Sequence, residues 1–112
     1  MPDDIPFRAI VDSLLDEVVF CDTDHVIRHM NPAAVEHYDE GAALLGTSIF
    51  DCHNDESSTV IREVFAEMQA GLPERKITDN DKMRIFMRAV RAPDGTLLGY
   101  YERYEHKRAD RD

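Results

Sequence analysis

Apolar side chains recur at helical spacing in two stretches of the chain. In residues 6–17 they fall three and four positions apart, which is the spacing of one face of an amphipathic helix. They are Phe7, Ile10, Val11, Leu14 and Leu15. Residues 57–70 keep the same period, and they are followed by Gly71 and Pro73, which are typical of a helix end. The pattern predicts an N-terminal helix over 6–17 and a longer helix over 57–70.

Short runs of β-branched and aromatic residues predict five strands. Two flank a turn and three follow the longer helix; they span 18–22, 26–30, 75–78, 83–91 and 97–105. Before the longer helix, Asn31 and Pro32 suit the start of a short helix, and residues 42–45 suit one further helical turn. This order predicts an α+β fold, in which a five-stranded antiparallel sheet carries short helices on one face, with the N-terminal amphipathic helix added.

Length and charge narrow the class of protein. The length of 112 residues suits one domain. The formal net charge of -10 repels phosphate backbones, so we expect no nucleic-acid or membrane binding. Residues 1–72 contain three basic and fifteen acidic side chains, and residues 73–112 contain ten basic and eight acidic ones. The sequence shows no membrane-spanning run and no signal-peptide pattern, so we expect a cytoplasmic protein with free thiols at Cys21 and Cys52.

Several pieces of the sequence, taken in order, resemble a PAS domain. Residues 18–30 and the Asn-Pro-Ala-Ala sequence from Asn31 are similar to the front half of that family, and Asp94-Gly95 with Gly99 is similar to its closing hairpin. The resemblance covers about residues 7–105. A narrower similarity, carried by residues 50–54 and 88–91, is to a PAS branch found in bacterial and archaeal signalling proteins.

The resemblance implies a sensory or protein-interaction module whose sheet and short helices enclose a ligand cavity. It also implies that the N-terminal helix pairs two subunits. PAS domains often leave the last strand through an Asp-Ile-Thr-like sequence that leads to an output domain, whereas this chain continues as Tyr104-Glu105-His106. We therefore expect a stand-alone PAS protein that acts through a signalling partner, or a fragment of a larger sensor. The expected parts are one domain over 1–112, with a cap helix over 6–17, a PAS core over 18–105 and a charged tail over 106–112.

Cys52 and His53 are adjacent side chains that can bind a haem iron or another metal. The alternative is that they precede a helix as a cap and a half-buried thiol. Haem-binding PAS sensors place their axial histidine on the long helix, and residues 57–70 contain no histidine. Flavin-adduct photochemistry is not expected, because the Gly-x-Asn-Cys motif of that branch is replaced by Gly-Thr-Ser-Ile from Gly46. The cofactor therefore stays unknown at this point, and no metal site is predicted from residue spacing.

Aromatic, thioether and basic residues on the last two strands suggest the wall of a ligand pocket. Phe86 and Tyr100 are candidates for contact with a planar ligand, and Arg88 can neutralise an anionic group. The alternatives are an ordinary core and a cross-strand pair between Arg88 and Glu102. His29 and His37 can approach one another where the second strand meets the next helix. The candidate cofactor-binding residues are Cys52, His53, Phe86, Arg88 and Tyr100.

Two functions fit these observations. The first is a sensory module that binds a small molecule and signals through protein contacts. The second is a ligand-free dimerisation module, in which the stripe from Phe7 to Leu15 forms the interface of a homodimer. A haem or redox sensor that uses Cys52 or His53 is a third, weaker alternative. An enzyme is not expected, because no nucleophile elbow or phosphate-binding loop is present and paired carboxylates such as Asp16-Glu17 are expected on a helix surface.

Overall fold

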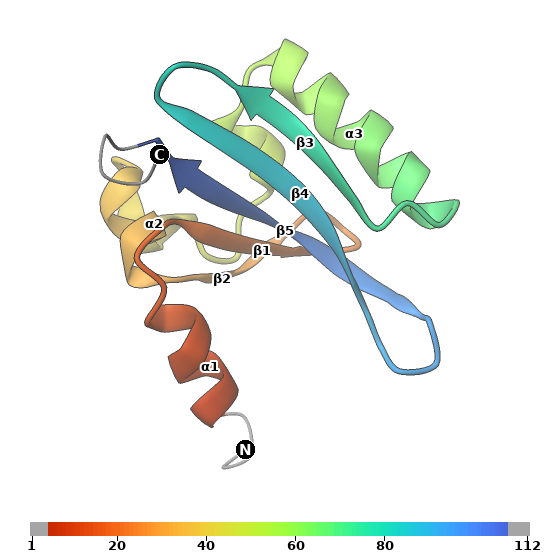
Figure 1. The fold of residues 1–112 in the computed structure, drawn as a ribbon, viewed down its shortest axis with the longest axis horizontal. Helices are drawn as coiled ribbons and strands as arrows, with labels where there is room; N and C mark the ends of the chain where they lie inside the picture. The colour runs from red at the N-terminus through yellow and green to blue at the C-terminus, as the bar shows by residue number, and fades with distance from the viewer. Residues whose placement is uncertain (1–4, 108–112) are drawn as a thin grey trace.

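The computed structural model describes residues 5–107, and its centre is one antiparallel sheet of five strands. The order across the sheet is β2-β1-β5-β4-β3, so the last strand lies in the middle (Figure 1). The strands are β1 (Val18–Asp22), β2 (Ile27–Met30), β3 (Glu74–Asp79), β4 (Met83–Arg91) and β5 (Leu97–His106). The predicted α+β class with a five-stranded antiparallel sheet is confirmed.

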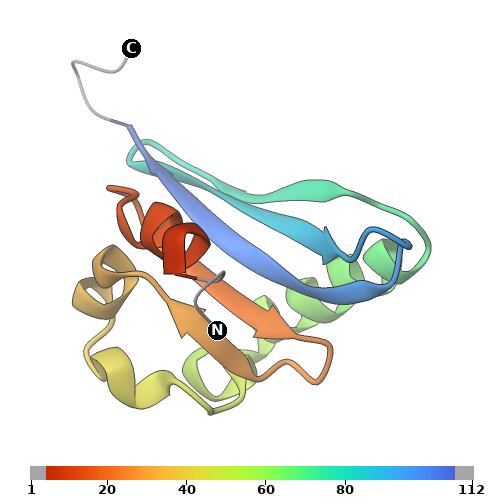
Figure 2. The same cartoon turned by 90° about the horizontal axis from the view of Figure 1, so that it is seen from below.

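Short helices cover one face of this sheet, called the inner face below. They are α2 (Pro32–His37), the 3-10 turns η2 (Gly41–Leu44) and η3 (Ile49–Cys52), and α3 (Asp55–Gln69). The core forms where α3 meets the sheet, because Ile61, Val64 and Met68 pack against Met87 and Tyr100. Figure 2 shows the helices following one another beside the sheet. Among the described residues, no helix has the length and apolar character that crossing a membrane requires.

Strand alternation decides which side chains reach the core. In β5, Tyr100, Glu102 and Tyr104 are buried on the inner face, while Tyr101 and Arg103 face outward. Gly99 is required at its position because a Cβ there would collide with the backbone oxygen of Cys21, and its φ of 152° disfavours other residues. The β1–β5 pairing therefore depends on that glycine.

Helix α1 (Ile5–Asp12) has no buried residue and projects from the rest of the molecule (Figure 1). It is shorter than the predicted helix over 6–17, because Ser13 Oγ bonds to the carbonyl of Ile10 and the chain leaves the helix. Leu14 and Leu15 consequently lie in the connection to β1. The predicted tail over 106–112 is also corrected at its start, since His106 belongs to β5; residues 108–112 lie outside the described residues.

Asn31 holds this connection in place. Its side chain is fully buried, and its Oδ1 accepts hydrogen bonds from the backbone N–H groups of Ala34 at 3.1 Å and Val18 at 3.0 Å. The first bond caps α2, as predicted, and the second fixes the start of β1. Its Nδ2 donates to the carbonyl of Asp16 at 2.9 Å. One amide thus joins α2, β1 and the segment that carries α1.

Candidate functional site

A cavity of about 290 Å³ lies between α3 and the inner face of β3, β4 and β5. Its apolar residues come from α3, β3 and β4, and its polar residues come from α3, β3, β5 and the position that follows η3. The apolar residues are Val60, Ile61, Ile77 and Ile85, and the polar ones include His53, Ser57, Glu102 and Tyr104. Small-molecule sites combine apolar walls with convergent polar groups, and this cavity has four apolar and six polar lining residues.

Glu102 is the unusual member of this lining. It is 2% exposed, and its Oε1 has no hydrogen-bond partner among the residues that the structure describes. Burial raises the pKa of the Glu102 carboxyl, because the charged form loses its hydration; a charge on His53 acts in the opposite direction. A buried acceptor without a donor costs about 1–3 kcal/mol, so Glu102 marks a place where a donor is missing.

His53, the residue that follows η3, lines the same cavity, and Cys52 is the last residue of η3. The imidazole Nδ1 of His53 is 2.9 Å from the carbonyl oxygen of Ile49 and 3.3 Å from Cys52 Sγ. The hydrogen bond with Cys52, opposed by desolvation and aided by the charge of Glu102, raises the pKa of His53 to about 9. A proton on His53 therefore supplies positive charge near the buried carboxyl at neutral pH. The haem or redox role of Cys52 and His53 stays a prediction, because the contacts shown are those of a helix-preceding cap.

A cluster of one histidine and three aromatic residues lies beside the inner face of β1 and β5. Tyr100 is fully buried, and its hydroxyl lies 2.9 Å from Nδ1 of His25. The His25 ring packs between Phe50 and Phe65, at centroid distances of 4.8 and 4.7 Å. Burial lowers the pKa of His25 and raises the pKa of Tyr100. Sequence reasoning treated His25 as a turn residue and missed this cluster, whose members come from separate elements.

The structure divides the five predicted cofactor-binding residues between two faces of the sheet. Cys52, His53 and Tyr100 lie on the inner side, whereas Phe86 and Arg88 belong to the outer face of β4. Register explains the split, because the inward residue Met87 pairs with Glu102. On the outer face Phe86 lies under the Arg103 guanidinium at 4.2 Å, and Arg88 is 3.6 Å from a Glu74 oxygen. The alternative considered for Arg88, a cross-strand pair with Glu102, is therefore wrong.

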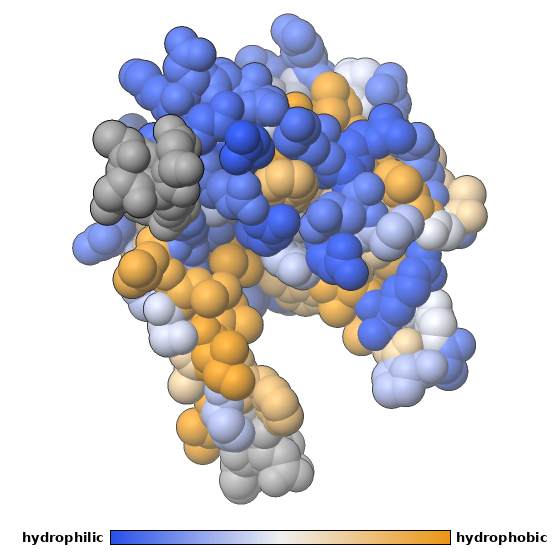
Figure 3. Space-filling model, in the orientation of Figure 1, coloured by the Kyte–Doolittle hydropathy of each residue, from blue (hydrophilic) through white to orange (hydrophobic). Residues whose placement is uncertain are grey.

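A wide groove separates α1 from the outer face of the sheet. Its volume is about 1220 Å³, and its apolar lining includes Phe7, Leu14 and Leu15 from the N-terminal segment and Phe20 and Tyr101 from the sheet. In Figure 3 hydrophobic residues gather over the projecting α1 region. Four of the five stripe residues are strongly exposed and Val11 is half-buried. The basic side chains on the rim are Arg8, Arg28, Arg84, Arg103 and Lys107.

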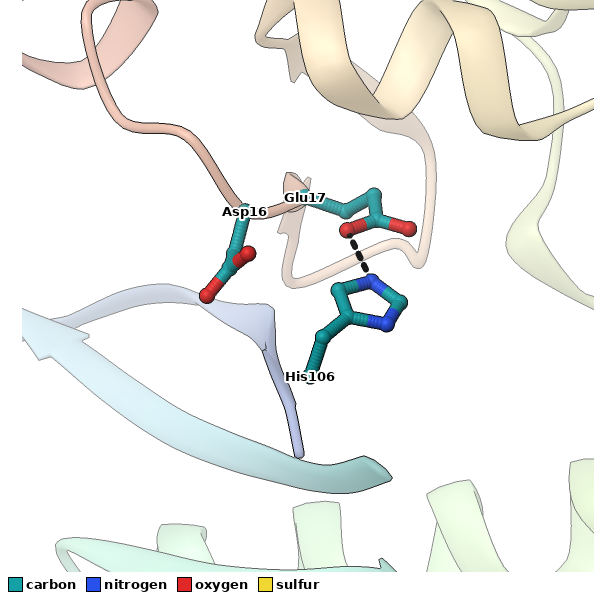
Figure 4. A group of neighbouring side chains, drawn as sticks. All are labelled: Asp16, Glu17 and His106. Atoms are coloured by element: carbon teal, nitrogen blue, oxygen red, sulfur yellow. Dashed lines mark hydrogen bonds and ion pairs between the residues drawn. The ribbon is translucent and has the colours of Figure 1, made fainter. Parts of the chain in front are cut away.

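The Asp16-Glu17 pair does not lie on a helix surface, which corrects the sequence expectation. Glu17 is 5% exposed, and its two oxygens bond to different histidines: Oε1 to His106 Nε2 at 2.7 Å and Oε2 to His37 Nδ1 at 2.8 Å. Figure 4 shows the Glu17–His106 contact with Asp16 beside it. The expected approach of His29 to His37 is also replaced, since His29 Nε2 bonds to Asp12 at 2.8 Å. These partners lie too far apart in sequence for spacing to reveal them.

Comparisons with known proteins agree on the fold. A family model described as PAS domain matches residues 8–105. The chain is similar in structure to a C-terminal domain from Streptococcus mutans, with 20% identity and a TM-score of 0.74 over 89% of this chain and 81% of that one. No curated protein matches the chain in sequence.

Two further solved structures are similar over nearly their whole length. A sensory box sensor histidine kinase from Vibrio cholerae has 12% identity and a TM-score of 0.64, and the match covers 95% of this chain and 92% of that one. The PAS domain of a protein from Colwellia psychrerythraea has 15% identity and a TM-score of 0.65, with 92% and 96% covered.

Proposed function

Because the chain belongs to the PAS domain family, we propose that it is a non-catalytic sensory module of the cytoplasm that binds a small molecule in its inner cavity. Signalling then proceeds through protein contacts made by α1 and the outer face of the sheet. The observation that carries the proposal is the buried Glu102, which lines the cavity and whose Oε1 has no hydrogen-bond partner among the described residues. Membership of the family supports the general role of a sensory module, and the binding of a small molecule is what we propose beyond it.

The cavity sets the size and chemistry of the ligand. A volume of about 290 Å³ suits a small molecule, because it lies at the lower end of the usual range for ligand sites. The apolar lining residues favour a ligand with an apolar body, and the unpartnered oxygen of Glu102 favours a ligand group that donates a hydrogen bond. A donor that meets Oε1 removes a penalty of about 1–3 kcal/mol, which then contributes to affinity.

Native mass spectrometry of the freshly purified protein tests this proposal. We expect a retained small-molecule mass in the wild-type protein and its loss in Glu102→Leu, which removes the acceptor. The matched control is Glu105→Leu, three positions along the same strand, which lies half-exposed and outside the cavity. A retained mass that is unchanged in Glu102→Leu, or a wild-type protein that releases no small molecule on denaturation, contradicts the proposal.

The exposed apolar side chains of α1 and of the connection to β1 support a second part of the proposal, a homodimer. Ile5, Phe7, Ile10, Leu14 and Leu15 are 49–84% exposed. Burial of a fully exposed side chain of this kind is worth about 1.5–3 kcal/mol. Because these five side chains are only partly exposed in each copy, two copies that bury them gain roughly 10–20 kcal/mol. The cost of association is about 4–15 kcal/mol. A second copy whose α1 enters the groove is therefore an adequate occupant, and each copy covers the other symmetrically.

Light scattering after size-exclusion chromatography tests the dimer. The double variant Phe7→Glu/Ile10→Glu should be monomeric at a concentration where the wild-type protein is dimeric, because four buried charges replace apolar contacts. Leu45→Glu is the matched control, since Leu45 is also an exposed apolar residue, at 43%, but lies in another part of the chain after η2. A dimer that persists in the double variant, or a wild-type monomer, contradicts this part.

A further inference from the structure

Three metal-binding side chains meet where the segment after α1 passes the end of β5 (Figure 4). Asp16 and Glu17 come from that segment, and His106 is the last residue of β5. One ligating atom from each of the three lies within 4.8 Å of the other two. We infer that Asp16, Glu17 and His106 form a binding site for a divalent transition-metal ion of the Zn²⁺ class. This site is separate from the inner cavity and does not depend on the proposed ligand.

Burial distinguishes this cluster from a surface group of carboxylates. The Glu17 side chain is 6% exposed, so its charge is held away from bulk water. His37, from the end of α2, bonds to the Glu17 oxygen that His106 does not contact. Ligating carboxylates are commonly held by such an outer hydrogen bond, which fixes their orientation. His37 is therefore a positioning residue for Glu17.

The donor types indicate which ions fit. One imidazole nitrogen and two carboxylates suit Zn²⁺ and Co²⁺, whereas Mg²⁺ and Ca²⁺ prefer oxygen ligands throughout. A set of three protein ligands leaves a fourth position for water or an external group. A dication also offsets the negative charges of Asp16 and Glu17.

The distances among these three side chains require only small side-chain movements for Zn²⁺ to bind. Zn²⁺ lies about 2.0–2.2 Å from nitrogen and oxygen ligands, so two donors of a tetrahedral site are roughly 3.3 Å apart. The Glu17–His106 contact of 2.7 Å must lengthen by about half an ångström when an ion takes the place of the shared proton. Asp16 must turn inward from its place in the 4.8 Å cluster. Rotation of side chains achieves both changes, because Asp16 and His106 are only half-buried.

The structure contains a matched control for this site. His29 and Asp12 form a similar imidazole–carboxylate pair at 2.8 Å, and their side chains are 31% and 35% exposed. This pair belongs to no cluster of three donors among the described residues. Removal of His29 therefore alters a histidine–aspartate pair near α1 without altering the proposed ligands.

Titration of the full chain with Co²⁺, after removal of any affinity tag and of bound metal, tests the inference. We expect one ion per chain, seen as visible absorption of four-coordinate Co²⁺ that Zn²⁺ then displaces. Asp16→Asn and His106→Ala should each weaken binding more than tenfold, and His29→Ala should change it less than twofold. Circular dichroism confirms that each variant is folded, and Asp16→Asn keeps the test valid if His106→Ala unfolds.

Three outcomes overturn the inference. The first is an absence of Co²⁺ binding by the folded wild-type protein. The second is binding that survives both Asp16→Asn and His106→Ala, including the case in which Cys52→Ser abolishes it and so assigns the ion to Cys52. The third is equal weakening by His29→Ala, since that result indicates a general effect on the region of α1.

Discussion

The replacement Asn31→Ala should cost this domain a large part of its stability, although it removes only a small side chain. Its Oδ1 accepts two backbone hydrogen bonds, from Val18 and Ala34, and its Nδ2 donates to Asp16. Loss of the cap on α2 costs about 1 kcal/mol. The buried N–H of Val18 loses its partner, which costs about 1–3 kcal/mol, and the bond to Asp16 adds about 1 kcal/mol. The expected loss is roughly 3–5 kcal/mol, against a typical total of about 5–15 kcal/mol for a domain.

Asn54→Ala is the matched control. Asn54 is the cap of α3 and accepts one bond, from the N–H of Ser57 at 2.8 Å, at an exposed position. Its replacement should cost only about 1 kcal/mol. Urea unfolding followed by circular dichroism suits this comparison, because the chain has no tryptophan. If the two variants lose the same free energy of unfolding within about 0.5 kcal/mol, the reasoning that Asn31 joins three elements is refuted.

Three other predictions concern the core. Glu102→Gln should be more stable than wild type, and in urea unfolding the difference should be larger at pH 7.5 than at pH 4.5. The reason is that burial raises the pKa of Glu102 in the folded protein, so the free energy of unfolding of the wild type falls as pH rises above the unfolded pKa of about 4.3. A difference that does not grow with pH contradicts this. Gly99→Ala should cost about 2 kcal/mol or more, because a Cβ meets the Cys21 oxygen, whereas Gly95→Ala meets nothing within 4 Å and should cost less in the same assay. Iodoacetamide should modify half-buried Cys52 before Cys21, whose pKa burial raises; mass spectrometry that finds Cys21 modified first in the folded protein refutes the assignment.

The elements of the fold were predictable because each leaves a local signal. Asn31 next to Pro32 indicates a helix start, and alternation in β5 places Glu102 and Tyr104 on one face. The end of α1 was not predictable from periodicity, since Leu14 and Leu15 continue the apolar spacing. The structure ends the helix at Asp12 because Ser13 and Asn31 bond to backbone groups of that region.

The candidate sites were less predictable because they depend on pairing between distant segments. Alternation alone separates Phe86 and Arg88 from Met87, and this signal was available in the sequence. The assignment of each set to a face needed the register of β4 with β5, in which Met87 lies opposite Glu102. The bond between Glu17 and His106 spans 89 positions, so no local spacing indicates it.

The central claim is that the inner cavity is a ligand site whose anchor is Glu102. A crystal structure of the protein as purified tests it most directly. The account predicts electron density for a small molecule between α3 and β5, with a donor atom within about 3.2 Å of Glu102 Oε1. A cavity that contains no such molecule, with Oε1 bonded instead to protein groups or ordered water, would contradict the account.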